Sequence, residues 1–452
     1  MLEIPKVNAI YKSIVNRTNT TTLWKITLVV IANGKRIAVR NVLSRDTLCD
    51  FEVKVTDEDF IFTQIGKTTF KNYILPFKDD LKAEVTYTLL SANGLEVVGH
   101  KKAVEVYRAF IIDPPNLDIS RKTTRNDNEQ LDELAGLLPI HFQLLPLKLI
   151  EMRLVDVMGV YKGNTVSDIL TTVLAYDLGD TKSKTALLKD SYAGIRGVNI
   201  VPPHNTKTYK NLIIPVGTKL TTIAKFLQKE CGIYTTGVNR YFKYGYWFVY
   251  PLYDPKRYAV TKKRATIVNM PQDELMSPES SFKVEGNEVF ILTSGEASIK
   301  DDTESISQNA GNAIRYSKSE CLIDGMNSTS KNKSKTNFSD TQVAISAEAK
   351  PNGMDNARYS ENVITDNPFA EMSVIAKGLV SLVKVNWANS RPEHIYPGMP
   401  VKFLYEKSGT LKEVYGSVLG MRTTQAPSSG KLQDNTYFTN TTLILAIQKI
   451  KG

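Results

Sequence analysis

The sequence predicts a β-rich α+β protein that has an antiparallel sheet or barrel near each end of the chain. Three observations indicate this fold class. Short runs rich in β-branched and aromatic residues lie near both ends, often beside turn residues. Two helical patterns lie in the middle, and a long polar stretch separates them from the last strands. The 452 residues therefore divide into a first strand-rich part at 1–112, a middle part at 113–294, a polar arm at 295–362 and a second strand-rich part at 363–452.

The first strand-rich part begins with the pattern of a hairpin. Residues 23–30 read LWKITLVV, and the Asn-Gly dipeptide at 33–34 is a strong signal for a two-residue turn. Residues 35–43 form the expected return strand. Residues 49–55 alternate apolar and charged side chains, as a strand with one buried face does. Two consecutive prolines at 114–115 close this part, because proline cannot donate to a strand ladder.

Two amphipathic helices are expected in the middle part. The run that begins at Ser167 places apolar residues at near-helical spacing, and Gly179 lies just past its end. A second run follows Gly217 and has one apolar face, with its lysines largely off that face. Gly232 is well placed to end this second helix.

The most aromatic segment covers residues 241–253, and a basic run follows at 256–264. The aromatic rings are interpreted either as a stacking platform for bases or sugars, or as a strand buried at a sheet or subunit interface. We favour the buried strand, because aromatic residues are among the best strand formers. The basic run is interpreted as a solvated edge strand, with phosphate contact as the alternative. The residues expected at a subunit or partner interface are Tyr244, Tyr246, Trp247, Tyr250, Lys256 and Arg257.

Residues 295–362 are dominated by Ser, Asn, Lys, Asp and Gly, which predicts an extended loop or a loosely ordered arm. Such a composition buries too little apolar surface to order itself, so we expect the arm to become ordered only in an assembly. The last part is again rich in strands, at 379–387, 401–405, 411–421 and 435–450. These short, closely connected strands predict a compact antiparallel barrel.

The composition and motifs exclude several classes of function. The cysteines Cys49, Cys231 and Cys321 are far apart and form no CxxC pair, so neither a disulfide scaffold nor a structural zinc site is expected. The 4 histidines are isolated from one another in the sequence. No Walker A, GxGxxG, HExxH, GxSxG or EF-hand pattern occurs. We therefore expect no metal, no cofactor and no enzymatic activity.

The formal net charge is +10, from 57 Lys and Arg against 47 Asp and Glu. Basic residues are spread from end to end instead of gathering on one short face, so acidic protein partners explain the charge at least as well as nucleic acid does. No secretory signal pattern opens the sequence. The best candidate for a membrane span, residues 134–152, is interrupted by two prolines, and we interpret it as a buried linker or core helix.

The order of these parts resembles the baseplate or tail hub protein of contractile-tailed phages and related contractile injection systems. Three stretches are similar to that family. TVSDILTTVL at 165–174 is like the helix that follows the first barrel. TKLTTIAKFLQKECGIY at 218–234, followed by the strand YGYWFVYPLYDP, resembles the helix and hairpin of the middle region. IYPGMPVKFLY at 395–405, followed by GSVLG at 416–420, looks like the final barrel.

The resemblance implies two tube-like antiparallel β-barrels per subunit and a homotrimer with pseudo-sixfold symmetry. Such a ring adapts the sixfold tail tube to the threefold central spike. The implied partners are the tail tube protein, the spike protein and the baseplate wedge proteins, and the implied location is the virion tail, assembled in the host cytoplasm. Nucleic acid is expected only as the genome that passes through the lumen. The second barrel is expected to be discontinuous, with strands from residues 212–250.

A first alternative is a tail-tip enzyme that degrades cell-wall glycan, or a glycan-binding protein. The aromatic segment would then line a sugar cleft, with Glu285 or Asp254 as the acid.

A second alternative is nucleic-acid binding, in which bases stack on Tyr246 or Trp247 and the basic run contacts phosphate. The basic residues that would make these contacts are Lys256, Arg257, Lys262, Lys263 and Arg264.

Overall fold

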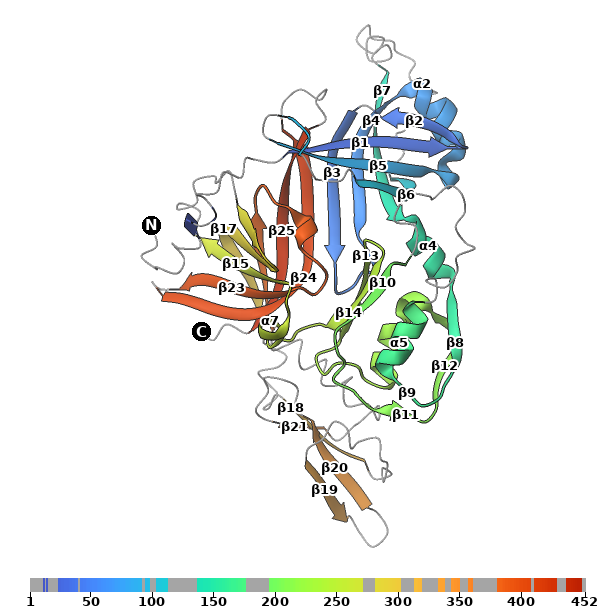
Figure 1. The fold of residues 1–452 in the computed structure, drawn as a ribbon. Helices are drawn as coiled ribbons and strands as arrows, with labels where there is room; N and C mark the ends of the chain where they lie inside the picture. Colours follow the sequence, from blue (N-terminus) through green and yellow to red (C-terminus); the bar gives the residue numbers. More distant parts are fainter. Residues whose placement is uncertain are drawn as a thin grey trace, which may run out of the picture.

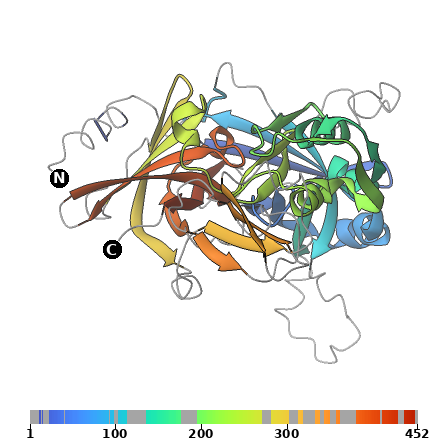
Figure 2. The ribbon, with the colours of Figure 1, turned by 90° about the horizontal axis from the view of Figure 1, so that it is seen from below.

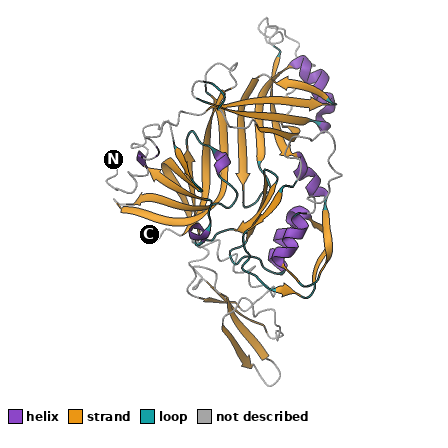
Figure 3. Ribbon diagram, viewed as in Figure 1, coloured by secondary structure: helices purple, strands orange, loops and turns teal. Residues whose placement is uncertain are grey.

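The computed structural model describes residues 11–12, 14, 23–39, 41–91, 94–97, 103–112, 136–175, 195–270, 281–301, 313–318, 332–337, 343–349, 357–360, 380–407, 410–428 and 436–448. Most of these residues belong to strands, and the largest sheet has fourteen strands. Figure 3 shows that the longer helical segments lie on the right-hand side of this strand-rich body, with short helical turns elsewhere. The fold is therefore β-rich, as the sequence predicts, and its largest sheet is mixed instead of purely antiparallel.

The pairings of the large sheet return on themselves in two closed circuits, which share the strands β24 (Thr410–Pro427) and β25 (Thr436–Gln448) (Figure 1). The first circuit continues from β25 through six further strands back to β24, and every pairing in it is antiparallel. In order of pairing these strands are β1 (Leu23–Ala32), β5 (Lys82–Leu90), β6 (Ala103–Ile112), β7 (Leu137–Pro146), β4 (Glu58–Gly66) and β3 (Asn41–Asp50).

The second circuit leaves β25 in the other direction and returns to β24 through four strands. In order of pairing they are β22 (Val380–Trp387), β17 (Glu288–Asp301), β15 (Arg264–Met270) and β23 (Pro400–Lys407). Strand β15 is parallel to both of its neighbours, and the other pairings are antiparallel. Two short strands pair on the outside of the circuits, β2 (Lys35–Val39) with β1 and β16 (Phe282–Glu285) with β17.

Each circuit packs against its own apolar core. Alternate residues of β1, among them Ile26 and Leu28, are buried in the first core together with Phe142 of β7. The second core gathers Phe403 of β23 and Trp387 of β22. The period of two in the burial pattern is what strands with one inward face require. The first core is closed at one end by a helical segment made of α2 (Lys67–Thr69), a π-helical turn (Phe70–Ile74) and a 3-10 turn (Leu75–Asp80).

The shared strands β24 and β25 are long enough to serve both circuits. The second half of β24 pairs with β3 between Gly420 and Gln425, and its first half pairs with β23 up to Ser417. A bulge between Val418 and Gly420 separates the two halves. A β-bulge bends and twists its strand, so the two halves can enter two differently oriented circuits.

Two glycines make the crossing between the circuits sterically feasible. A Cβ atom at Gly416 would lie 1.9 Å from the carbonyl oxygen of Ala446, and one at Gly420 would lie 2.7 Å from that of Cys49. Both neighbours are backbone atoms, which cannot move away as the end of a side chain can. Glycine is therefore required at these positions because of close backbone approach.

The middle part contains the two predicted helices. Helix α5 (Val166–Leu174) begins with a capping box between Thr165 and Asp168, and Gly179 lies outside the described residues. Helix α6 (Ile223–Glu230) follows a 3-10 turn (Leu220–Thr222). Gly232 ends α6 with φ +76°, and its N–H bonds to the carbonyls of Leu227 and Gln228. The prediction that Gly232 stops this helix is confirmed.

The helices α5 and α6 pack with a three-stranded sheet, whose order is β10 (Gly197–Ile200), β14 (Tyr246–Pro251) and β13 (Val238–Lys243). Two short ribbons complete this part: β9 (Asn164–Thr165) with β11 (Thr208–Tyr209), and β8 (Asp156–Tyr161) with β12 (Leu212–Lys219). In Figure 2, as in Figure 1, this green middle part lies on the side of the molecule away from the yellow strands of the second circuit.

Three sequence-based expectations differ from the structure. The aromatic segment, predicted from its composition as one strand, is a hairpin of β13 and β14, with Tyr244 and Gly245 at positive φ in the turn, which agrees with the hairpin that the resemblance implies. The basic run is no edge strand. It holds α7 (Arg257–Val260) and the start of β15, which has a paired strand on each side. The apolar stretch at 134–152 forms β7 and α4 (Leu147–Leu154) instead of a linker or one broken helix.

The polar arm also differs from the expected extended loop. Its residues 295–301 belong to β17, and its other described residues form β18 (Ala313–Lys318), β19 (Asn332–Asn337), β20 (Val343–Ala349) and β21 (Ala357–Ser360). These strands make a four-stranded sheet of their own, in the order β19-β20-β18-β21. Within the ranges that the structure describes, no helix is long and apolar enough to cross a membrane.

Replacement of Gly416 by alanine should destabilise the protein by about 1–3 kcal/mol, the usual cost of forcing extra atoms into a packed site. The added methyl group would collide with the backbone of β25. Urea unfolding followed by circular dichroism measures this loss. Gly66→Ala is the matched control, because a Cβ there meets its nearest atom at 3.7 Å and φ is −57°. Equal stability of the two variants would contradict the steric argument.

Candidate functional site

The six residues predicted at an interface separate into two groups. Trp247 is completely buried against Phe242, with ring centroids 5.3 Å apart. Tyr250 is also buried, and its hydroxyl donates to the carbonyl of Phe51 at 3.2 Å. Arg257 is buried and donates from Nη1 to the carbonyl of Gly398 at 2.9 Å. These three side chains therefore make contacts within the chain.

The other three predicted residues, Tyr244, Tyr246 and Lys256, are exposed. Tyr244 and Tyr246 stand at the tip of the β13–β14 hairpin, and Lys256 precedes α7. Any contact of this region with a partner must therefore use the hairpin tip and the surface near Lys256. The assignment of the six residues to an interface remains a prediction.

Three charged residues named for the two alternative functions have partners within the chain. Asp254 is buried and accepts the backbone N–H of Lys256 at 3.1 Å. Glu285 pairs with Lys283 at 2.9 Å. Arg264 is paired with Glu288 at 3.1 Å and lies over the ring of Tyr258. Because Trp247 is buried, it has no free face on which a base could stack.

A cavity of about 280 Å³ lies where the first circuit meets the tip of the β13–β14 hairpin, and it is the candidate site. The side chains around it come from five strands of the first circuit, from the segment between β3 and β4, from the hairpin and from a loop before β23. They are Trp24, Arg45, Thr47, Cys49, Asp57, Tyr87, Glu105, Tyr107, Lys243, Tyr244, Pro392, Glu393, Met421, Thr423 and Gln425.

Strand periodicity explains why one wall of the cavity is polar. Arg45, Thr47 and Cys49 alternate along β3, so all three side chains point to the same face. They pair across the ladder with Gln425, Thr423 and Met421 of β24, which also line the cavity. Polar side chains of β3 and β24 therefore face the cavity, whereas the core of the first circuit is apolar.

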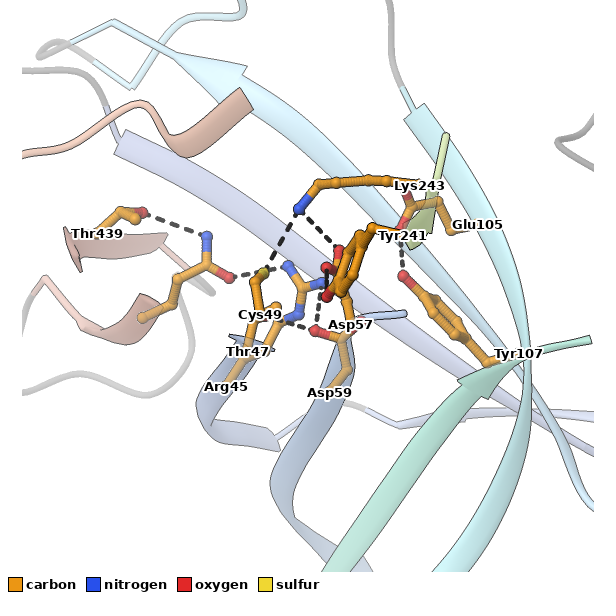
Figure 4. Close-up of polar contacts among 11 residues, drawn as sticks. Arg45, Thr47, Cys49, Asp57, Asp59, Glu105, Tyr107, Tyr241, Lys243 and Thr439 are labelled. Atoms are coloured by element: carbon orange, nitrogen blue, oxygen red, sulfur yellow. Dashed lines mark hydrogen bonds and ion pairs between the residues drawn. The ribbon is translucent and has the colours of Figure 1, made fainter. Parts of the chain in front are cut away.

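Two ion pairs hold this wall together (Figure 4). Arg45 Nη2 lies 2.9 Å from Asp59 Oδ1, and the hydroxyl of Thr47 donates to the same carboxylate. Lys243 Nζ lies 2.8 Å from Asp57 Oδ2, and the hydroxyl of Tyr241 donates to Asp57 Oδ1 at 2.7 Å. The second pair joins the hairpin to the segment between β3 and β4, so it fixes the middle part against the first circuit.

The electrostatics of the cavity favour charged Lys243 and Asp57. Burial disfavours the charged form of both side chains. The opposite charge of the partner and the hydrogen bonds outweigh this effect, so the pKa of Lys243 is raised and the pKa of Asp57 is lowered. Burial and the neighbouring Asp57 raise the pKa of the Cys49 thiol well above its usual value. Cys49 is therefore a neutral thiol that accepts from Lys243 Nζ at 3.5 Å, and it is a poor nucleophile.

Glu105 is the exception among the carboxylates of the cavity. The hydroxyl of Tyr107 donates to it, but none of the described residues forms an ion pair with it. Burial raises its pKa, and the charges of Asp59 and Asp57 raise it further, while Arg45 and the Tyr107 hydrogen bond act against this shift. The folded state therefore holds the charged form of Glu105 less favourably than the unfolded chain does.

The sequence analysis did not single out Arg45, Asp57, Glu105 or Lys243. The alternation of β4 did indicate that Asp59 is buried, because Asp59 lies on the same face of the strand as Ile61 and Ile65. No group of three or more His, Cys, Asp and Glu side chains in the described part of the chain is placed to hold a metal ion. What the arrangement does offer is a polar cavity with aromatic walls and fixed charges.

No protein-family model and no curated protein sequence matches the chain. Among solved structures, a tail protein from Neisseria meningitidis MC58 is similar with a TM-score of 0.42 and 12% identity, over 93% of this chain and 96% of that one. A 43 kDa tail protein of prophage MuSo2 from Shewanella oneidensis has a TM-score of 0.45 and 10% identity, over 93% and 98%. A component of the type VI secretion system of E. coli, described as similar to tail proteins of bacteriophage T4, has a TM-score of 0.37 and 10% identity, over 93% and 77%.

These three structures are phage-type tail proteins and a secretion-system component that resembles them. The identities do not exceed 12% and the TM-scores lie below 0.5. This likeness therefore establishes neither what the chain does nor what it binds.

Removal of Lys243 should be strongly destabilising. Lys243→Met leaves Asp57 without its cation, and breaking a buried pair in this way costs about 3–5 kcal/mol. Lys54→Met is the control, because the exposed Lys54–Glu58 pair should contribute less than about 0.5 kcal/mol. Denaturant unfolding of both variants measures the difference. A double variant, Lys243→Met with Asp57→Asn, should recover part of the loss, and no recovery would argue against the charge-pair explanation.

Glu105→Gln should stabilise the protein at neutral pH, because the folded state holds a carboxylate whose pKa is raised. The protonated side chain contributes stability that is complete below the unfolded pKa of about 4.3 and is lost as pH rises through the folded pKa. The advantage of the glutamine variant should therefore shrink as the pH is lowered toward 4. Unfolding curves of wild type and variant at several pH values test this, and parallel pH profiles would contradict it.

Proposed function

We propose that the chain is the structural hub subunit of a phage-type tail baseplate, and that three copies form a ring between a sixfold tail tube and a threefold central spike. The observation that carries the proposal is the pair of closed strand circuits in one chain, each with its own apolar core. In the proposal each circuit is a tube-like β-barrel. Three copies with two barrels each place six barrels around a threefold axis, so such a ring suits partners of either symmetry.

The proposed barrels do not coincide with continuous stretches of sequence. The first barrel takes its strands from residues 1–112, with β7 and the ends of β24 and β25 to close it. The second combines residues 363–452 with β15 and β17. It is discontinuous, as the sequence resemblance implies, but its borrowed strands lie at 264–301 and not at 212–250.

The order of elements between the barrels also supports the proposal. The stretches that resemble hub proteins fold as α5, as α6 with the β13–β14 hairpin, and as β23 with the first half of β24. In this proposal the protein is not an enzyme. Its partners are the tail tube, spike and wedge proteins, it resides in the virion tail after assembly in the host cytoplasm, and the genome passes through its lumen.

A candidate surface for the subunit contact is the outer face of the ribbon formed by β8 and β12. Four large apolar side chains of this ribbon are exposed, and so is Leu154, which lies just before the ribbon. The exposed fractions of these five side chains lie between 56% and 81%. The other face packs inward, with Val157 and Leu212 in or against the core of the middle part. Exposed apolar clusters of this kind mark contacts with partners. The side chains of the face are Leu154, Met158, Val160, Ile213 and Val216.

Mass measurement of the purified protein tests the trimer. Light scattering after size exclusion should give about three times the 50.5 kDa of one chain, and electron micrographs should show rings with threefold symmetry. A particle that stays monomeric when tail tube and spike proteins are added would overturn the proposal.

Charge on the apolar face should weaken the ring without unfolding the subunit. Met158→Asp combined with Ile213→Asp places two carboxylates where subunits are proposed to meet, so the trimer should dissociate at concentrations where wild type remains assembled. Leu95→Asp is the control, since Leu95 is equally exposed but lies elsewhere. Circular dichroism verifies the fold. Equal assembly of both variants would remove this face from the interface.

A further inference from the structure

The segment that follows β10 holds the end of helix α6 in place. Asn205 is 4% exposed, and its side-chain nitrogen donates to the carbonyls of Cys231 and Gly232 at 2.9 and 2.8 Å. The backbone N–H of His204 donates to the carbonyl of Ile233 at 3.0 Å. Carbonyls at the end of a helix lack partners within the helix, and these bonds supply them. The link between α6 and β13 is therefore fixed by this segment.

The imidazole ring of His204 adds a bond that only its neutral form can make. The backbone N–H of Thr235 donates to Nδ1 at 3.1 Å, and Nδ1 accepts through its free lone pair. The proton of the neutral ring is therefore on Nε2, which lies 3.9 Å from Oδ2 of Asp254. The edge of the ring also packs against Tyr234, with ring centroids 5.6 Å apart. His204 thus lies between the link after α6 and the segment after β14.

Asp254 connects this cluster to the second circuit. It belongs to the segment between β14 and α7, and it accepts the backbone N–H of Lys256 at 3.1 Å. Arg257, at the start of α7, is buried and donates to the carbonyl of Gly398, just before β23. His204 is therefore placed where the middle part of the chain meets the second circuit.

Protonation of the ring changes the role of one atom. The second proton must go to Nδ1, because Nε2 already carries one. Nδ1 then becomes a donor and can no longer accept from the N–H of Thr235. The hydroxyl of Thr235, which lies 3.0 Å from Nδ1, can accept the new bond, so the ring keeps a partner while the backbone N–H loses one. Thr235 is half-buried, and an amide that loses its acceptor there costs free energy unless water reaches it.

The surroundings of the ring favour its neutral form. Burial lowers the pKa of His204 below its usual value, and the charge of Asp254 acts against this shift without cancelling it. The ionisable groups that face the ring are Asp254 and Tyr234, and Arg257 and Lys256 lie close to Asp254. Arg257 is itself a cation, so it competes with a protonated ring for the carboxylate.

From this geometry we propose that His204 is a pH-sensitive latch on the link between α6 and β13. In its neutral form the ring holds the N–H of Thr235, and the link is closed. In mild acid the protonated ring releases this N–H and is attracted to Asp254, and the link opens to water. The inference is independent of the hub proposal, because it requires only the folded subunit.

Hydrogen–deuterium exchange of the whole chain, measured by mass spectrometry between about pH 7.5 and pH 5, tests the latch. Protection is taken as the observed exchange rate relative to the intrinsic rate at each pH. Protection of the peptide that contains Thr235 should fall about fivefold as the pH is lowered, the change that corresponds to one hydrogen bond. Protection of β1 should not change over this range. Constant protection at Thr235 would overturn the proposal.

Two substitutions at one position separate the acceptor from the titration. His204→Asn places an amide oxygen close to the position of Nδ1, and an amide does not titrate, so protection at Thr235 should stay high at every pH. His204→Gln has no acceptor at that position, so protection should be low at every pH. Circular dichroism verifies that both variants fold. A fall in acid that persists in His204→Asn would assign the effect to other groups and overturn the role given to His204.

The protonation of the ring can be followed directly. Exchange of the C2 hydrogen of histidine, also read by mass spectrometry, should titrate at the same pH as the loss of protection at Thr235. In Asp254→Asn both changes should move to lower pH, because the carboxylate that attracts the protonated ring is gone. If the ring titrates while Thr235 keeps its protection, His204 is a titrating side chain without a latch, and the proposal fails.

Discussion

The two circuits of this protein depend on the strand pair β24–β25, which belongs to both. Long strands alone would not permit this, because the chain must change direction while its backbone hydrogen bonds continue. The bulge beside Gly420 supplies the bend, and the absence of side chains at Gly416 and Gly420 allows the backbones of β25 and β3 to approach closely. In this fold, the sterics of two residues therefore control the relative orientation of two cores.

The middle part is attached to this frame by a different kind of interaction. Its hairpin tip contacts the first circuit beside the cavity, where Lys243 meets Asp57. A buried ion pair adds little net stability, because desolvation offsets most of the attraction. Its contribution here is to fix the position of the hairpin tip. An apolar tip could slide along an apolar wall, whereas Lys243 can satisfy its charge at one place only.

Local features were predictable from the sequence, and distant pairings were not. The turn at Asn33-Gly34 and the stop of α6 at Gly232 depend on neighbouring residues, so their patterns identified them. Strand β1 pairs with β25 some four hundred positions later, and no local pattern encodes that contact. The basic run was misjudged for the same reason. Both neighbours of β15 come from other parts of the chain, and the partner of Arg257 is a carbonyl at Gly398. Near the cavity, the alternation of β4 predicts that Asp59 is buried, but it does not predict which side chains surround Asp59.

The polar residues of the cavity do not all serve the same purpose. The ion pairs of Lys243 and Arg45 position the hairpin and the β3 wall, so their charges have structural partners. Glu105 has none, and its raised pKa means that the folded state loses stability to keep it ionised. A glutamine would accept the same hydrogen bond from Tyr107 without that loss. The docking of the hairpin therefore does not explain a carboxylate at this position.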